Sequence, residues 1–141
     1  MKKLFLFFVA IAFSVPSFAH SDENWQESDM LKNMQPEDKA ALLMVHFGTS
    51  YDDTRAATID ALNKKAQQEF PQLAFAEAYT SRMIINILGK RGVEKDTPLE
   101  ALLKLRAAGF THIVVQSSNV IDGAEMESLR KDIAQVEQFF K

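Results

Sequence analysis

Cysteine is absent from all 141 residues of this chain. Its absence excludes disulfide bonds and thiolate metal sites, so stability has to come from an apolar core, and any metal has to be bound by histidine, carboxylate or backbone oxygen. The sequence also lacks an excess of basic residues, because its formal net charge is −3. A negative charge argues against a nucleic acid as partner, since binding to phosphates depends on clustered Lys and Arg.

The apolar run near the start of the chain is too short to span a membrane. It covers residues 4–15, about 12 residues, whereas a membrane-spanning helix needs ~20. Lys2 and Lys3 precede it, and small residues up to Ala19 follow it, which is typical of a cleavable secretory signal. We therefore expect residues 1–19 to be removed and the protein to be periplasmic, with no membrane attachment afterwards.

The rest of the chain divides into two parts. Residues 20–39 are acidic and contain few apolar side chains, which predicts a flexible leader. Residues 40–141 are enough for one domain, and apolar runs alternate there with helical patterns. This alternation predicts an α/β fold with an open, mainly parallel sheet flanked by helices. The expected strands are 41–47, 73–79 and 112–116, and the expected helices are 51–69, 81–90, 98–108 and 124–139. Thr97 and Glu100 form a capping box at the start of the helix 98–108.

A turn follows the first expected strand directly. Open α/β sheets bind ligands at the carboxyl ends of their strands, so this turn is a candidate site. Gly48 would allow close approach of the backbone, and Ser50 is expected to cap the next helix. The free N–H groups of that helix would favour an acidic or carboxylated ligand. The alternative is an ordinary strand-to-helix connection.

Four blocks of sequence resemble, in order and spacing, the sirohydrochlorin cobaltochelatases of the anaerobic cobalamin pathway. They are ALLMVHFGTSYDDTR at 41–55, AYTSRMII at 78–85, DTPLEAL at 96–102, and VVQS at 114–117 with Gly123 and Glu125 after it. The resemblance implies one lobe of a class II chelatase, in which two α/β lobes face each other across a tetrapyrrole cleft. It also implies Co²⁺ as the substrate metal, sirohydrochlorin as the acceptor and no organic cofactor.

The resemblance covers the first lobe only, whereas the family's metal-binding histidines and a glutamate lie in the second. We therefore expect either a homo-oligomer or pairing with a second chelatase lobe. If the two lobes are pseudo-symmetric, Glu77 and Glu125 occupy the places of that glutamate and one histidine, and His46 precedes the place of the other. His46, Glu77 and Glu125 are the candidate catalytic residues, and the two glutamates are the candidate metal ligands.

Each of these residues has an alternative structural role. His46 at a strand end is often a hydrogen-bonded structural histidine. Glu77 lies in an apolar strand, where an unpaired buried carboxylate costs several kcal/mol, so it either faces the cleft or has a partner. Arg55 and Arg82 could bind the substrate's carboxylates or pair with Asp52, Asp53 or a neighbouring carboxylate, and His112 is expected to be structural. The candidate substrate-binding residues are Phe47, Gly48, Thr49, Ser50, Tyr79, Arg82, Met83 and Asn119.

Asn119 stands where relatives often carry a histidine, which argues against metal or haem ligation by that loop. The leading function is therefore insertion of Co²⁺ into sirohydrochlorin. The alternatives are a non-catalytic periplasmic binder of haem or a related tetrapyrrole, or an inactive half-enzyme.

Overall fold

The fold is built on a three-stranded parallel sheet with β1 in the middle. The structure, a computed structural model, describes residues 29–141, so the expected signal segment and the first part of the expected leader lie outside the described residues. The strands are β1 (Ala40–His46), β2 (Ala74–Tyr79) and β3 (His112–Ser117), in the order β2-β1-β3. Both neighbours run parallel to β1, which confirms the expected fold class.

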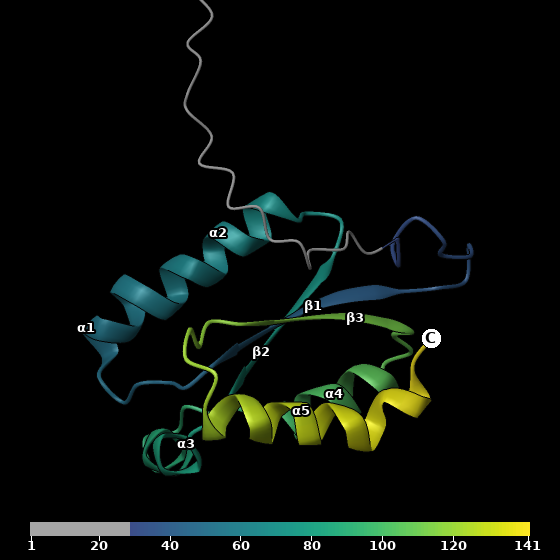
Figure 1. The fold of residues 1–141 in the computed structure, drawn as a ribbon. Coiled ribbons are helices and arrows are strands. Elements are labelled where there is room, and N and C mark those ends of the chain that lie inside the picture. The colour runs from purple at the N-terminus through teal and green to yellow at the C-terminus, as the bar shows by residue number, and fades with distance from the viewer. Residues whose placement is uncertain (1–28) are drawn as a thin grey trace, which may run out of the picture.

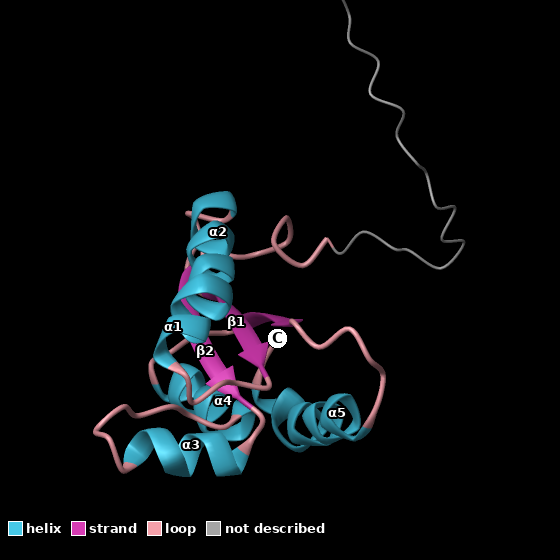
Figure 2. Ribbon diagram, turned by 90° about the vertical axis from the view of Figure 1, so that its left-hand side faces the viewer, coloured by secondary structure: helices cyan, strands magenta, loops and turns pink. Residues whose placement is uncertain are grey.

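Helices cover the two faces of this sheet. One long helical stretch follows β1 and consists of α1 (Asp52–Arg55), a π-helical segment (Ala56–Asp60) and α2 (Ala61–Glu69). It lies on one face, whereas α4 (Pro98–Ala107) and α5 (Ala124–Val136) lie on the other (Figure 1). The helix α3 (Arg82–Gly89) follows β2 beside the carboxyl edge of the sheet, and a short 3-10 turn (Glu137–Phe139) follows α5 (Figure 2). No helix in the described range 29–141 is long and apolar enough to cross a membrane.

The main core lies between the sheet and the pair α4 and α5. Leu43 and Val45 of β1 are fully buried there, packed in one cluster with residues of both helices. All residues of β1 from Ala41 to His46 are buried, which confirms the expectation that this strand is covered on both faces. A smaller cluster on the other side joins Tyr79 to Ile84 and Leu88 of α3. The two clusters hold the strand ends and the loops after them in fixed positions.

The start of α4 confirms the expected capping box. The Thr97 Oγ1 accepts a hydrogen bond from the Glu100 N–H at 3.4 Å, and the Glu100 Oε2 accepts one from the Thr97 N–H at 2.8 Å. Pro98 follows as the first helical residue, where its missing N–H costs nothing. These local interactions fix where the helix begins.

The expectation that Ser50 caps the first helix is wrong. The chain remains extended at Tyr51, so the cap position falls one residue later, and no side chain of the described residues caps the helix there. The Ser50 carbonyl instead accepts a hydrogen bond from Arg91 Nη1 at 2.7 Å. Asp52 and Asp53 in the first turn place negative charge at the positive end of the helix, which offsets the missing cap.

Candidate functional site

The loops at the carboxyl ends of the three strands carry many exposed apolar side chains. Of the ten large hydrophobic residues that are exposed in the described part of the chain, five lie in or beside these loops. They are Phe47, Tyr51, Met83, Val120 and Ile121, with exposures of 46, 74, 67, 98 and 78%. A concentration of uncovered apolar groups at one edge is typical of a binding surface. This edge is therefore the candidate functional site.

A buried histidine lies at the centre of the edge. His46 ends β1 and is 1% exposed. Its Nδ1 is 2.8 Å from the Ser118 Oγ, in the loop after β3, and its Nε2 is 2.8 Å from the Asn63 Oδ1 of α2. The ring of Tyr79 meets the imidazole at 87°, with 6.3 Å between the centroids. Three elements therefore hold the imidazole in place.

Glu77 extends this set of hydrogen bonds across β2. Its Oε1 accepts a hydrogen bond from the Asn63 Nδ2 at 2.9 Å, and its Oε2 pairs with the Lys95 Nζ at 2.5 Å. Of the two alternatives for Glu77, the structure shows the one with partners inside the fold. The Lys95 ammonium also lies 5.1 Å from the centre of the Tyr79 ring, a cation–π distance. We call the connected residues Ser118, His46, Asn63, Glu77 and Lys95 the polar relay.

Glu125 lies apart from the buried members of the polar relay. It belongs to the first turn of α5 and lines an open pocket of about 390 Å³ formed by the loop after β3. The other lining residues are Ser118, Asn119, Val120, Ile121, Gly123 and Ala124. In residues 29–141, no group of three or more His, Asp and Glu side chains could hold a metal ion. One copy of the described chain therefore offers single carboxylates rather than a complete metal site.

Ser118 is the functional candidate that the sequence analysis did not identify. It is exposed, it lines the pocket beside Glu125, and its hydroxyl contacts His46. It alone belongs to both the pocket and the polar relay. The available signal was its position directly after the third strand, at the same edge as Gly48.

The turn after β1 depends on glycine. Gly48 has φ +100°, and a Cβ there would lie 2.5 Å from Tyr79 Cδ2. Tyr79 is fully buried beneath this turn, and its hydroxyl has no hydrogen-bond partner within the described residues. Burial, together with the nearby Glu77 charge, raises the pKa of the Tyr79 phenol well above its usual value. Tyr79 therefore supports the turn from below, while Phe47 is exposed above it.

The two arginines differ in their surroundings. Arg55 pairs with Asp52 at 2.8 Å, which is the salt-bridge alternative, and its buried Nη1 has no hydrogen-bond partner among residues 29–141. Arg82 is exposed in the first turn of α3, beside a small pocket of about 70 Å³ that Asp132 also lines. His112 is buried at the amino end of β3, with its Nδ1 2.9 Å from the Thr111 Oγ1. His112 therefore has the expected structural role, at the edge opposite the site.

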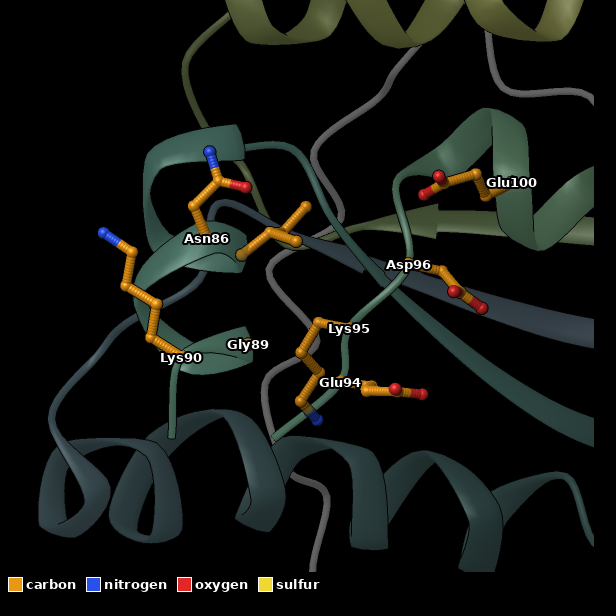
Figure 3. Close-up of a pocket in the computed structure, with 8 residues that line it drawn as sticks. Asn86, Gly89, Lys90, Glu94, Lys95, Asp96 and Glu100 are labelled. Carbon is orange, nitrogen blue, oxygen red and sulfur yellow. The ribbon is translucent and has the colours of Figure 1, made fainter. Parts of the chain in front are cut away.

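A second open pocket, of about 610 Å³, lies between α3 and the segment before α4 (Figure 3). Three of its five charged side chains have partners within the fold. Lys95 pairs with Glu77, Asp96 pairs with Lys104 at 2.6 Å, and Glu100 belongs to the capping box. The polar relay thus ends at this pocket, whereas the predicted site residues gather at the loops on the other side.

Comparison with known proteins agrees with this geometry. The family model described as cobalt chelatase (CbiK) matches residues 40–141. The sirohydrochlorin cobaltochelatase of Salmonella typhimurium is 40% identical over 103 residues, which cover 72% of this chain and 39% of that protein. The sirohydrochlorin cobaltochelatase CbiKC of Nitratidesulfovibrio vulgaris is 30% identical over 111 residues, covering 77% of this chain and 39% of that protein. The aligned residues thus span 39% of the length of each relative.

Proposed function

The chain belongs to the cobalt chelatase (CbiK) family, and from this we propose that it acts as one lobe of a chelatase that inserts Co²⁺ into sirohydrochlorin. The observation that carries the proposal is the exposed apolar edge beside an open pocket. A tetrapyrrole is a flat, largely apolar ring with carboxylates at its rim, and Phe47, Met83 and Ile121 offer apolar contact to such a ring.

Metal insertion exchanges two pyrrole protons for one divalent cation. The protein has to bring the cation to the ring nitrogens and remove the protons. Glu125 is the carboxylate in the pocket after β3, and carboxylate oxygen is a suitable ligand for a cation in a chain without cysteine. We assign Glu125 to delivery of the cation, with further ligands from the lobe on the other side of the cleft. That lobe is a second copy of this chain or a separate chelatase lobe.

The test measures Co²⁺ insertion from the absorbance change of sirohydrochlorin, against the uncatalysed background. Replacing Glu125→Gln removes the charge and keeps the shape, so the insertion rate should fall by at least about tenfold, or ~1.4 kcal/mol in the barrier. The dissociation constant for sirohydrochlorin should change little. Glu127→Gln is the matched control, because Glu127 lies in the same turn and pairs with Lys131, at 3.4 Å, on an exposed surface.

Two outcomes would contradict the chelatase proposal. A wild-type chain that binds sirohydrochlorin but does not exceed the background rate would be a tetrapyrrole-binding protein. A chain that neither binds sirohydrochlorin nor inserts Co²⁺, whether assayed alone or with a separate second chelatase lobe, would be an inactive half-enzyme. Equal rates for the two glutamate variants would remove Glu125 from the mechanism without removing the activity.

A further inference from the structure

The Ser118 hydroxyl lies between the open pocket and the buried imidazole of His46. We propose that Ser118 and His46 form the hydroxyl–imidazole pair that accepts pyrrole protons during metal insertion, with Asn63 and Glu77 as positioning residues. This inference rests on the proposed function and deepens it by naming the proton acceptor. It assigns the buried members of the polar relay to proton handling and leaves cation delivery to Glu125.

The hydrogen-bond direction along the polar relay follows from the charge at one end. Glu77 is paired with Lys95, and an ionised carboxylate can only accept hydrogen bonds. The Asn63 amide must therefore turn its Nδ2 toward Glu77, at 2.9 Å, and its Oδ1 toward His46. The amide orientation is thus determined by a neighbour on another element.

The same reasoning determines the tautomer of the imidazole. Because the Asn63 Oδ1 only accepts, the His46 Nε2 must carry the hydrogen in their 2.8 Å contact. A neutral imidazole has one N–H, so Nδ1 is an acceptor, and the Ser118 hydroxyl donates to it across 2.8 Å. This is the arrangement in which a histidine takes a proton from a hydroxyl.

Packing prevents the imidazole from turning to another orientation. His46 is 1% exposed, and the edge-on contact with Tyr79 fixes the plane of the ring. Tyr79 itself is buried and stays neutral, because burial raises the pKa of its phenol. The pair is therefore preorganised, and of its two residues Ser118 is the one that lines the pocket.

The proposed step balances as follows. A pyrrole N–H gives its proton to the Ser118 Oγ while the Ser118 proton moves to the His46 Nδ1. The electron pair left on the pyrrole nitrogen binds the incoming Co²⁺. The imidazolium donates from Nε2 to Asn63, which is polarised by the Glu77 carboxylate, and this lowers the cost of the buried charge. The proton then returns through the same hydroxyl to water, and the second pyrrole proton follows.

Glu77→Gln tests the positioning role without changing the shape of the residue. A glutamine can donate to the Asn63 Oδ1, so the Asn63 amide is free to reverse and present its Nδ2 to His46. The reversed amide favours the hydrogen on Nδ1, which would then no longer accept from Ser118. We expect the wild-type chain to show the Nε2–H tautomer of His46 by ¹⁵N NMR and the Glu77→Gln variant to show a mixture. The His46 signals are assigned by comparison with His20→Gln and His112→Gln, which remove the signals of the other two histidines.

Kinetics test the catalytic role of the hydroxyl. Ser118→Ala should lower the Co²⁺ insertion rate by about 10²-fold, the lower end of what a positioned base contributes, with an unchanged dissociation constant for sirohydrochlorin. Ser117→Ala is the matched control, because the Ser117 Oγ accepts a hydrogen bond from the Asn119 N–H at 3.1 Å, whereas the partners of the His46 ring are Ser118 and Asn63. Glu77→Gln should give an intermediate loss of rate.

Three results would overturn the inference. An Nδ1–H tautomer in the wild-type chain would reverse the direction of the polar relay. A Ser118→Ala variant that inserts cobalt at the wild-type rate would remove the pair from the reaction while leaving the chelatase function in place. A wild-type chain that inserts no cobalt, either alone or with a separate second chelatase lobe, would overturn the proposed function, and the inference with it.

Discussion

At the scale of single residues, the site depends on the fit between Gly48 and Tyr79. The backbone at Gly48 passes so close to the Tyr79 ring that a methyl group has no room there. Gly48 also has a φ of +100°, a backbone conformation that residues with a side chain rarely adopt. The turn in this position brings Phe47 to the surface and keeps Tyr79 against His46. One glycine therefore determines both the exposed edge and the packing of the buried imidazole.

We expect Gly48→Ala to destabilise the protein by about 2 kcal/mol or more, because it combines backbone strain with a steric clash. Urea unfolding followed by circular dichroism measures the free energy. Gly89→Ala is the control, since a Cβ at Gly89 meets nothing within 4 Å and the residue is helical. The control should be neutral or stabilising by up to ~1 kcal/mol. An equal loss of unfolding free energy in the two variants would show that the close contact between Gly48 and Tyr79 does not contribute to stability.

At the scale of elements, the segment before β1 is tied to Lys141, two residues beyond the 3-10 turn that follows α5. Asp38 is 2% exposed at its side chain, and its Oδ1 is 2.6 Å from the Lys141 Nζ. The hydrogen bond from Lys141, helped by the Gln35 N–H, lowers the pKa of the Asp38 carboxyl to about 2. The carbonyl of Thr111, directly before β3, accepts a hydrogen bond from the Lys141 N–H at 2.9 Å. A salt bridge and a backbone hydrogen bond therefore hold the end of the chain at the amino edge of the sheet.

This pairing predicts a dependence of stability on pH. A carboxyl with a lowered pKa in the folded state stabilises the protein above its unfolded pKa, which is ~3.9. That stabilisation is lost as the pH falls through about 2. Asp38→Asn should therefore unfold at lower urea than the wild type at pH 7, and the difference should disappear between about pH 4 and pH 2.

Lys141→Gln provides the matched control for Asp38→Asn. It should give a similar loss at pH 7, and the double variant should be no less stable than either single variant, because both remove the same interaction. Additive losses would contradict the pairing. A constant difference down to pH 2 would show that Asp38 acts through packing rather than charge.

At the scale of the whole molecule, the apolar edge is left open by a single copy. Val120 is 98% exposed and Ile121 78% exposed, in the loop that lines the pocket with Glu125. Covering such a surface favours association, and an isologous dimer is the simplest closed arrangement. It would also place two copies of Glu125 and Ser118 around one cleft.

Sedimentation at micromolar concentration should therefore show a dimer of the wild-type chain. Val120→Glu should weaken association by at least about tenfold, or ~1.4 kcal/mol, because it places a charge in the apolar contact. Ala134→Glu adds the same charge on an exposed position near the end of α5, and it should leave the dimer intact. A wild-type monomer that captures no second lobe would contradict this expectation.

Export is the other property of the whole molecule that can be tested directly. We propose that the protein is exported and begins at His20 after cleavage, since the start of the chain has the pattern of a secretory signal. Mass spectrometry of the native protein should find that terminus. Ala19→Phe should block processing, because the residue before the cleavage point must be small. An intact Met1 on a cytoplasmic species would refute the proposal.

Much of the fold could be predicted from the sequence because its signals are local. The expected strands and helices match the observed ones to within about two residues at most ends, and the capping box at Thr97 lies where its motif placed it. The prediction that Ser50 caps the first helix was wrong because the chain stays extended for one residue more. That extension depends on how the turn packs on Tyr79.

The sequence by itself determined the order of strands and helices, the edge that carries the site and the family, because periodicity, caps and motif spacing are properties of neighbouring residues. Only the tertiary structure decided which candidates meet. Asn63 of α2 and Ser118 of the loop after β3 meet at His46, and Glu77 of β2 contacts Asn63. The partner of Glu77 and the tautomer of His46 depend on these contacts, which no local pattern in the chain records.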